Sequence, residues 1–167
     1  MLKRVPARAA PADRVREGTV GGRFAIVASR YNAEFVDGLL RAAEAELRAA
    51  GVRDVEVVRV PGAFEIPAVA ARLARRPAGR GRPVAIICLG VIFQGQTSHA
   101  EHIGWGVTEA LVRLQVEHAL PIVHGVFVFK KVEHARVRCL GRKHNRGREA
   151  AQTALEMARL MAALRKG

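Results

Sequence analysis

Apolar residues follow two different periods along this chain, and the two periods alternate. Four short runs are rich in apolar residues, at residues 24–29, 54–60, 83–89 and 121–129. The first is almost continuously apolar, and the second is rich in β-branched side chains. Runs of this length and composition are typical of strands that are covered on both faces of a sheet. The pattern therefore predicts four buried strands.

Between these runs, apolar residues recur at intervals of three and four, which predicts helices. Val36, Leu40, Ala43 and Leu47 show this spacing in the first of them. Strands that alternate with helices form parallel sheets with right-handed connections. We therefore expect an α/β fold with a four-stranded parallel sheet and helices on both faces. The expected helices lie between residues 32 and 51, and over residues 63–76, 99–118, 132–140 and 147–164.

Polar or unusual residues follow every predicted strand. They are Tyr31 and Asn32 after the first strand, residues 62–65 after the second, residues 90–99 after the third and Lys130 after the fourth. The carboxyl ends of parallel strands meet at one edge of the sheet, where ligands bind in open α/β folds. The sequence therefore predicts a site at this edge.

The stretch 89–99 carries the strongest sign of such a site. It is expected to connect the third strand to the long helix, and its polar residues can donate hydrogen bonds. Ser98 and Glu101 form a capping-box pattern, which predicts Ser98 at the N-cap and His99 in the first helical turn. Unpaired N–H groups and the positive end of a helix dipole favour an anion there. An imidazole beside an anion site is a candidate for proton transfer.

The composition fits one domain that needs no crosslinks. The chain has 167 residues, half of them hydrophobic, which is enough to bury a single core. Residues 1–22 lack the apolar centre of a signal peptide, so we expect an arm, able to add to a neighbour's sheet, before a single domain at 23–167. Cys88 and Cys139 lie far apart and outside any CxxC motif, which indicates reduced cysteines in a cytoplasmic protein.

The charge pattern raises three classes of partner and weakens two of them. The formal net charge is +13, and residues 130–148 alone hold eight Lys and Arg residues against one Glu. Such an excess attracts nucleic acid, anionic membranes or phosphorylated small molecules. Aromatic residues make up only 5% of the chain, and the sequence has no nucleic-acid motif and no run as long as a membrane span. We therefore expect a phosphorylated small molecule.

Two motifs and their spacing resemble the lumazine synthases (6,7-dimethyl-8-ribityllumazine synthases). The first is Val-Pro-Gly-Ala-Phe-Glu-Ile-Pro at 60–67, and the second is Leu-Gly-Val-Ile-Phe-Gln-Gly-Gln-Thr-Ser-His at 89–99. Arg-Tyr-Asn at 30–32, Pro-Ile-Val-His-Gly at 121–125 and Ala-Leu-Glu-Met-Ala at 154–158 follow the family order as well. The likeness extends over about residues 22–164, and it depends on the order of the motifs rather than on any one of them.

The resemblance implies a flavodoxin-like three-layer sandwich that assembles into homopentamers or multiples of them, with each active site at a subunit interface. It also implies a transferase of riboflavin biosynthesis. Such an enzyme condenses 5-amino-6-(D-ribitylamino)uracil with 3,4-dihydroxy-2-butanone 4-phosphate and releases phosphate and water. The reaction is expected to need no cofactor. The sequence leaves open whether pentamers stay single, pair into decamers or close into a larger shell.

The same resemblance implies roles for individual residues. His99 would carry protons during the reaction, Glu65 would accept hydrogen bonds from the ribityl hydroxyls, and Tyr31 would stack on the pyrimidine ring. The phosphate would be bound by Gln96, Thr97 and Arg138. The remaining residues expected to line the pyrimidine and ribityl site are Ala63, Phe64, Val91, Ile92, Phe93 and His124.

Several positions depart from the family pattern. Val91 stands where a Thr is common, and Gln96 stands where an Ala is common, so the donors to phosphate can differ. His124 stands where the neighbouring subunit of the family presents an apolar or aromatic residue to the ring. Further departures lie at residues 129–131 and at Val137. The sequence leaves open whether Arg146 contacts the substrate.

Three other interpretations compete with this one. A catalytically inactive protein of the same fold could form a shell or bind polyanions through residues 130–148, and its binding would weaken steeply with salt. A mononucleotide binder is disfavoured because no glycine-rich fingerprint follows the first strand. His99 and His102 have the spacing of metal ligands, and His99 with Glu101 imitates part of a zinc deaminase motif. A zinc deaminase is disfavoured because no Pro-Cys-x-x-Cys follows. We expect His102 to face solvent or a subunit contact, and therefore expect no metal.

Overall fold

Four parallel strands form the middle layer of the molecule, in the order β2-β1-β3-β4. The computed structural model describes residues 21–165. The strands are β1 (Phe24–Ser29), β2 (Val55–Val60), β3 (Ala85–Phe93) and β4 (Ile122–Phe129). Each neighbouring pair is parallel, as the alternation of the two periods predicts.

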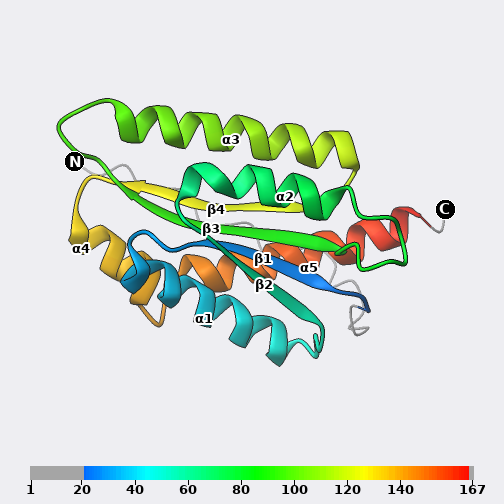
Figure 1. Cartoon of the computed structure of the whole chain (residues 1–167). Coiled ribbons are helices and arrows are strands. Elements are labelled where there is room, and N and C mark those ends of the chain that lie inside the picture. The colour runs from blue at the N-terminus through cyan, green and yellow to red at the C-terminus, as the bar shows by residue number, and fades with distance from the viewer. Residues whose placement is uncertain (1–20, 166–167) are drawn as a thin grey trace.

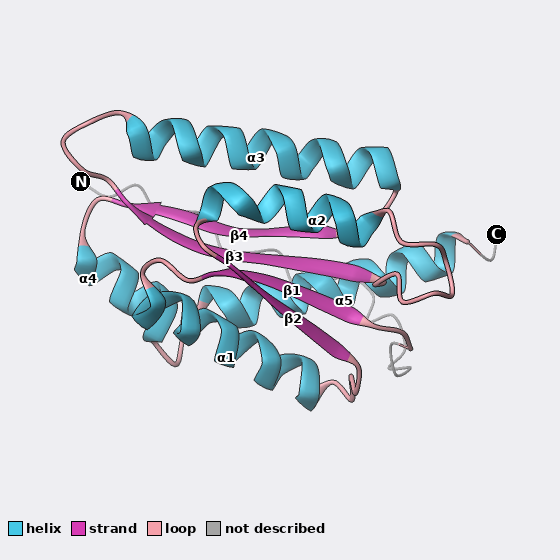
Figure 2. Ribbon diagram, in the orientation of Figure 1, coloured by secondary structure: helices cyan, strands magenta, loops and turns pink. Residues whose placement is uncertain are grey.

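Helices cover both faces of this sheet (Figures 1 and 2). One face carries α1 (Ala33–Ala49) and α5 (Arg146–Leu164), and the other carries α2 (Ile66–Ala74) and α3 (His99–His118). The short helix η1 (Ala63–Glu65) precedes α2, while α4 (Val132–Ala135) and the π-helical segment η2 (Arg136–Leu140) connect β4 to α5. The three layers confirm the predicted flavodoxin-like α/β sandwich.

The apolar core is divided by the sheet into two clusters. Along β3, Ile87 and Leu89 pack toward α1 and α5, whereas Ile86 and Cys88 pack toward α2 and α3. Strand residues point alternately to the two faces, so a strand buried on both sides needs apolar residues at every position. This requirement explains why the runs that form β1 and β3 are nearly continuously apolar in the sequence.

The third strand is longer than its sequence predicts. It does not end at Leu89 but continues to Phe93, because its pairing with β4 extends to Phe93 and Phe129. The pairing with β1 stops at Ala28 and Leu89. The last four residues of β3 therefore have a neighbouring strand on one side only. The connection to α3 shortens to residues 94–98.

The predicted N-caps are only partly correct. Ser98 does stand at the N-cap of α3 and His99 is its first residue, but the Ser98 side chain makes no capping hydrogen bond. The same is true of Asn32 before α1. Its backbone is left-handed (φ 57°, ψ 43°), and its Nδ2 donates instead to the carbonyl oxygen of Val91 over 2.7 Å. Asn32 therefore links the end of β1 to the end of β3.

Other predictions concern the chain ends and the cysteines. The expected arm at 1–22 and its pairing with a neighbour lie almost wholly outside the described residues. Cys88 and Cys139 are free and buried, as expected of structural thiols. Among residues 21–165, no helix combines the length and the apolar character needed to cross a membrane.

Candidate active site

The carboxyl ends of β1, β2 and β3 and the start of α3 surround a pocket of about 800 Å³. It lies at the edge of the sheet where the sequence predicts a site, on the face covered by α2 and α3. Eight predicted site residues line it, namely Tyr31, Ala63, Phe64, Glu65, Val91, Ile92, Phe93 and His99. The other lining residues are Asn32, Gly62, His102 and Ile103.

The extended end of β3 forms one wall of this pocket. The Phe93 ring packs on the opposite face of the sheet, with its centroid 5.4 Å from that of Phe35 in an edge-to-face arrangement. Phe93 is therefore held by its side chain and adjoins the pocket with its main chain. Because β1 does not pair beyond Leu89, the side of β3 that faces away from β4 is open to a ligand here. On this side, the Val91 carbonyl already accepts a hydrogen bond from Asn32 Nδ2.

Two aromatic side chains flank the pocket and are unusually exposed. Tyr31 follows β1 and is 69% exposed, and Phe64 lies in η1 after β2 and is 65% exposed. Large apolar groups that remain exposed around a hollow are typical of binding sites. Exposed aromatic rings of this kind can stack on a flat ring system.

The Glu65 carboxylate is positioned by the backbone of its own turn. Its Oε2 accepts a hydrogen bond from the Gly62 N–H over 2.8 Å. The group stands immediately before α2, where the positive end of the helix dipole favours an anion. Its second oxygen, Oε1, has no hydrogen-bond partner within residues 21–165. The carboxylate can therefore accept hydrogen bonds from a polar ligand.

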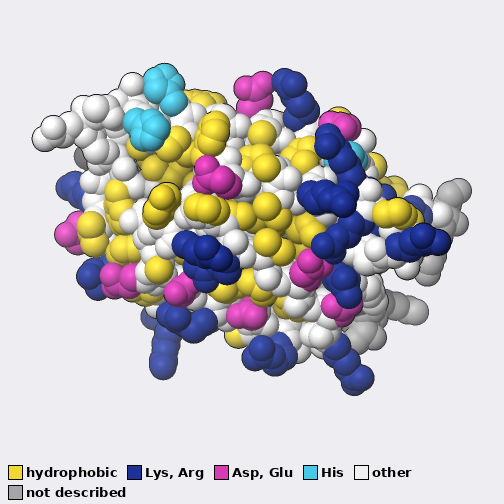
Figure 3. Space-filling model, viewed as in Figure 1, with side chains coloured by type: hydrophobic (Ala, Val, Ile, Leu, Met, Phe, Trp, Pro, Cys, Tyr) yellow, Lys and Arg dark blue, Asp and Glu magenta, His cyan; other side chains and the backbone are white. Residues whose placement is uncertain are grey.

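Hydrogen bonds of Gln94 hold the start of the loop that precedes α3. The Gln94 N–H donates to the Phe129 carbonyl over 2.9 Å, and Gln94 Nε2 donates to the Thr97 carbonyl over 2.9 Å. The His99 N–H lies 3.4 Å from Thr97 Oγ1. Gln96 and Thr97 are exposed and adjoin the pocket without lining it. Figure 3 shows imidazole groups at the surface over the start of α3, beside apolar side chains.

Arg138 does not line this pocket. It lies in η2, which follows the carboxyl end of β4 at the same edge of the sheet, and its side chain is half-buried. In the described part of the chain its guanidinium has no carboxylate within ion-pair distance, whereas Arg136 lies 3.3 Å from Glu34. Within the described part of the chain, Arg138 therefore has no acidic partner, whereas the charge of Arg136 is partly neutralised by Glu34.

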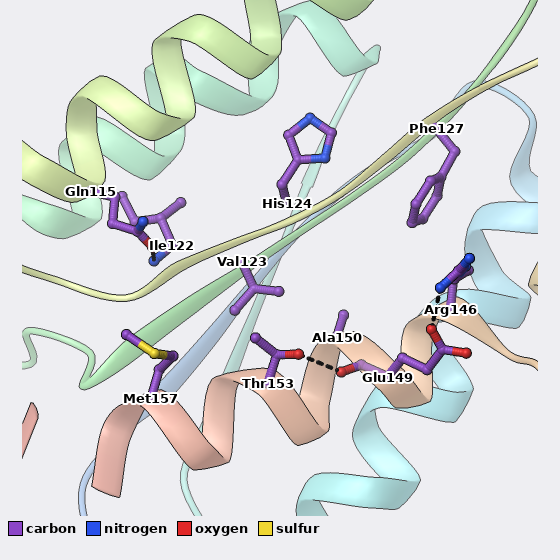
Figure 4. A pocket seen from close by; sticks show the side chains of 10 residues that line it. All are labelled: Gln115, Ile122, Val123, His124, Phe127, Arg146, Glu149, Ala150, Thr153 and Met157. Atoms are coloured by element: carbon purple, nitrogen blue, oxygen red, sulfur yellow. Dashed lines mark hydrogen bonds and ion pairs between the residues drawn. The ribbon is translucent and has the colours of Figure 1, made fainter. Parts of the chain in front are cut away.

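His124 lies outside the pocket as well. It borders a second hollow, of about 440 Å³, between β4 and α5, and in Figure 4 its ring points to the opposite side of β4 from Val123. Thr108 Oγ1 on α3 lies 2.9 Å from His124 Nε2. Burial lowers the pKa of this imidazole. Arg146 borders the same hollow and pairs with Glu149.

Sequence reasoning missed part of the pocket lining. His102 follows His99 by three residues and therefore lies on the same side of α3. The His102 side chain is exposed, in agreement with the prediction that it faces solvent or a subunit contact, but it also lines the pocket, which the sequence does not predict. Gly62 was visible only as part of a motif. Within the described residues, no group of three His, Cys, Asp or Glu side chains could hold a metal ion.

Known proteins resemble this chain over most of its length. The family model for 6,7-dimethyl-8-ribityllumazine synthase matches residues 21–162. A protein of that name from Stenotrophomonas maltophilia (strain K279a) is 41% identical over 141 residues, which are 83% of this chain and 88% of the relative. One from Xanthomonas campestris pv. campestris (strain B100) is 40% identical over 141 residues, 83% of this chain and 89% of the relative. The chain therefore belongs to the 6,7-dimethyl-8-ribityllumazine synthase family.

Proposed function

We propose that this chain condenses 5-amino-6-(D-ribitylamino)uracil with 3,4-dihydroxy-2-butanone 4-phosphate to form 6,7-dimethyl-8-ribityllumazine, releasing phosphate and water. Family membership gives the reaction. The observation that supports it most strongly within the chain is the pocket itself, which combines two exposed aromatic rings, an open strand edge, a carboxylate and an imidazole. The described pocket contains nothing that favours the inactive, polyanion-binding alternative.

The pyrimidine and its ribityl chain would occupy the wall formed by the strand ends. Tyr31 supplies an exposed ring for stacking, and the main chain of Val91 and Phe93, on either side of Ile92, supplies donors and acceptors along an edge without a strand neighbour. Glu65 accepts hydrogen bonds from hydroxyl groups through its unoccupied oxygen. Ribityl hydroxyls are suitable donors to such a carboxylate.

The phosphate of the second substrate would be bound at the start of α3. Gln96 and Thr97 stand on the loop directly before the helix, whose N–H groups and dipole favour an anion. A guanidinium completes such a site well because its planar donors match two phosphate oxygens. Arg138 is the proposed donor, and it would come from a neighbouring copy of the chain because it does not line the same pocket.

His99 would carry protons between the steps. The amine of one substrate attacks the ketone of the other to form a Schiff base, and water leaves. Elimination of phosphate then requires removal of a proton from carbon. The ribitylamino nitrogen finally attacks the remaining carbonyl, and loss of a second water closes the ring. An imidazole at the pocket surface can accept and return these protons.

A homopentamer, or a multiple of it, is part of this proposal. Exposed apolar residues on α3 support an assembly, among them Trp105 and Val116, each 76% exposed. The outer edge of β4 has no strand partner among residues 21–165, and His124 stands beside it. We place His124 against the ring bound by a neighbouring copy. The buried free thiols of Cys88 and Cys139 support a reducing, cytoplasmic location.

The test is formation of the fluorescent lumazine from the two substrates by the purified chain. The reaction should run much faster than the uncatalysed mixture, and His99→Ala should slow kcat by about 100-fold or more, the usual contribution of a general acid–base group. His144 is exposed and does not line the pocket, so His144→Ala is the matched control. Equal rates with and without the protein would exclude the enzyme, and equal losses in both variants would exclude the role of His99.

A further inference from the structure

Gly62 lies where Tyr31 and Glu65 come together at the pocket. A Cβ atom built on Gly62 would stand 2.9 Å from Glu65 Oε2 and 3.0 and 3.2 Å from Tyr31 Cδ2 and Cε2. Real Cβ atoms essentially never approach another atom closer than 3.0 Å. A side chain at this position therefore cannot coexist with both groups where they now lie.

The backbone of Gly62 does not itself require glycine. Its dihedral angles are φ −130° and ψ 177°, an extended conformation that any residue adopts. Its N–H is used in the hydrogen bond to Glu65, but an alanine could donate the same bond. What glycine contributes here is the space occupied by the Tyr31 ring and the Glu65 carboxylate.

Tyr31 cannot restore the space by moving its main chain. The N–H groups of Arg30 and Tyr31 both donate to the Pro61 carbonyl, over 3.1 and 3.0 Å, and Arg30 donates to Val60 as well, over 2.8 Å. These bonds fix the end of β1 to the residue before Gly62. Only the side chains can yield, so the ring would turn about its own bonds and the carboxylate would shift.

We propose that Gly62 is a positioning residue of the site, which sets the Tyr31 ring and the Glu65 carboxylate in a fixed relation by having no side chain. This inference rests on the proposed function, in which the ring stacks on the pyrimidine and the carboxylate binds the ribityl hydroxyls. One backbone position thus aligns the two groups that hold different ends of the same substrate. Their alignment determines how well that substrate fits.

Gly62→Ala tests the proposal by kinetics. The KM for the ribitylamino-uracil should rise about two- to tenfold, the factor that a displaced aromatic contact is worth. The KM for the phosphorylated ketone should stay within about twofold, since that substrate is bound elsewhere. Gly21→Ala is the matched control, because among residues 21–165 no atom outside the chain neighbours lies within 4 Å of a Cβ at that position. Equal changes in both KM values would overturn the proposal.

A spectroscopic readout separates positioning from a general loss of structure. Tyr31 is the only tyrosine of the chain, so ring-fluorinated tyrosine gives a single fluorine NMR signal. Gly62→Ala should shift this signal in the substrate-free protein, and Gly21→Ala should not. An unmoved signal would overturn the role of Gly62 and leave the proposed function intact. A normal pyrimidine KM in Tyr31→Ala would instead contradict the stacking role within the proposed function.

A double-mutant cycle covers the case in which Gly62→Ala is too unstable to assay. Removing the ring with Tyr31→Ala frees the space that the new methyl group needs. Gly62→Ala should therefore lower the denaturation midpoint less in the Tyr31→Ala background than in the wild type. Equal losses in both backgrounds would show that the methyl group does not meet the ring and would overturn the proposal.

Discussion

Arg138→Ala is the variant that probes the proposed phosphate site most directly. The guanidinium is half-buried in η2 and has no carboxylate within ion-pair distance among residues 21–165. Its removal breaks no ion pair of the described chain. The free energy of unfolding should therefore change by about 0.5 kcal/mol or less, as for most surface substitutions. Any large effect must appear in catalysis.

The size of that effect follows from the chemistry of the contact. A hydrogen bond between charged groups contributes about 1.5–3 kcal/mol. We therefore expect the KM for 3,4-dihydroxy-2-butanone 4-phosphate to rise by about 10- to 100-fold, since each 1.4 kcal/mol is a factor of about ten. The KM for the ribitylamino-uracil should change little. Steady-state kinetics with each substrate varied in turn measures both values.

Arg136→Ala is the matched control. It removes the same charge two positions away in η2, but its guanidinium lies 3.3 Å from Glu34. If the general positive charge of residues 130–148 attracted the substrate, both variants would raise the KM alike, and salt would abolish the difference from wild type. Equal effects of the two variants would refute a specific contact by Arg138.

Four further predictions concern stability and its dependence on pH. Gly147→Ala would place a methyl group on the Leu39 carbonyl oxygen, so it should destabilise the fold by about 1–3 kcal/mol in urea unfolding. Gly106→Ala, whose Cβ would meet no atom closer than 3.9 Å, should instead be neutral or stabilising. Asn145→Ala removes the cap of α5, where Asn145 Oδ1 accepts from the Gly147 N–H over 2.8 Å, and should cost about 0.5–2 kcal/mol in the same assay, with unchanged stability contradicting the cap. Burial lowers the pKa of His124 in the folded chain. As the pH falls below about 6.5, His124 is therefore protonated more readily in the unfolded chain than in the folded chain, and this difference favours unfolding. His124→Gln should therefore reduce the loss of thermal stability between about pH 7 and pH 5, and an unchanged pH profile would contradict this.

The fold could be predicted from the sequence because β1 and β3 are buried on both faces, and β2 and β4 are still rich in apolar residues. Each strand is then visible as a short apolar run, and each helix as an amphipathic stretch between two runs. The errors are at positions where a distant partner decides the structure. The end of β3 depends on β4, which lies about thirty residues later in the chain. The amide of Asn32 binds Val91 rather than its own helix, and no local pattern shows that choice.

The candidate site also contains residues that their local position in the sequence predicts and residues that depend on a distant partner. Tyr31, Glu65 and His99 directly follow strands or begin helices, so the parallel topology alone brings them together. Arg138 and His124 were assigned by resemblance, and within one chain they lie outside the pocket. Sequence order says which residues follow a strand. It does not say which copy of a chain completes a site.

The extra length of β3 has a direct consequence for recognition. The main-chain N–H and C=O groups of a strand in the middle of a sheet are normally hydrogen-bonded to the two neighbouring strands, so they cannot bind a ligand. Beyond Leu89, β3 still pairs with β4 but no longer pairs with β1. One main-chain group on the unpaired side, the Val91 carbonyl, accepts a hydrogen bond from Asn32 Nδ2. Asn32→Ala would leave this carbonyl unpaired and the strand end loosely held. We expect a several-fold rise in the KM for the ribitylamino-uracil together with a small loss of stability, measured by kinetics and urea unfolding. A stability loss without any change in that KM would show that the open edge of β3 does not bind the pyrimidine.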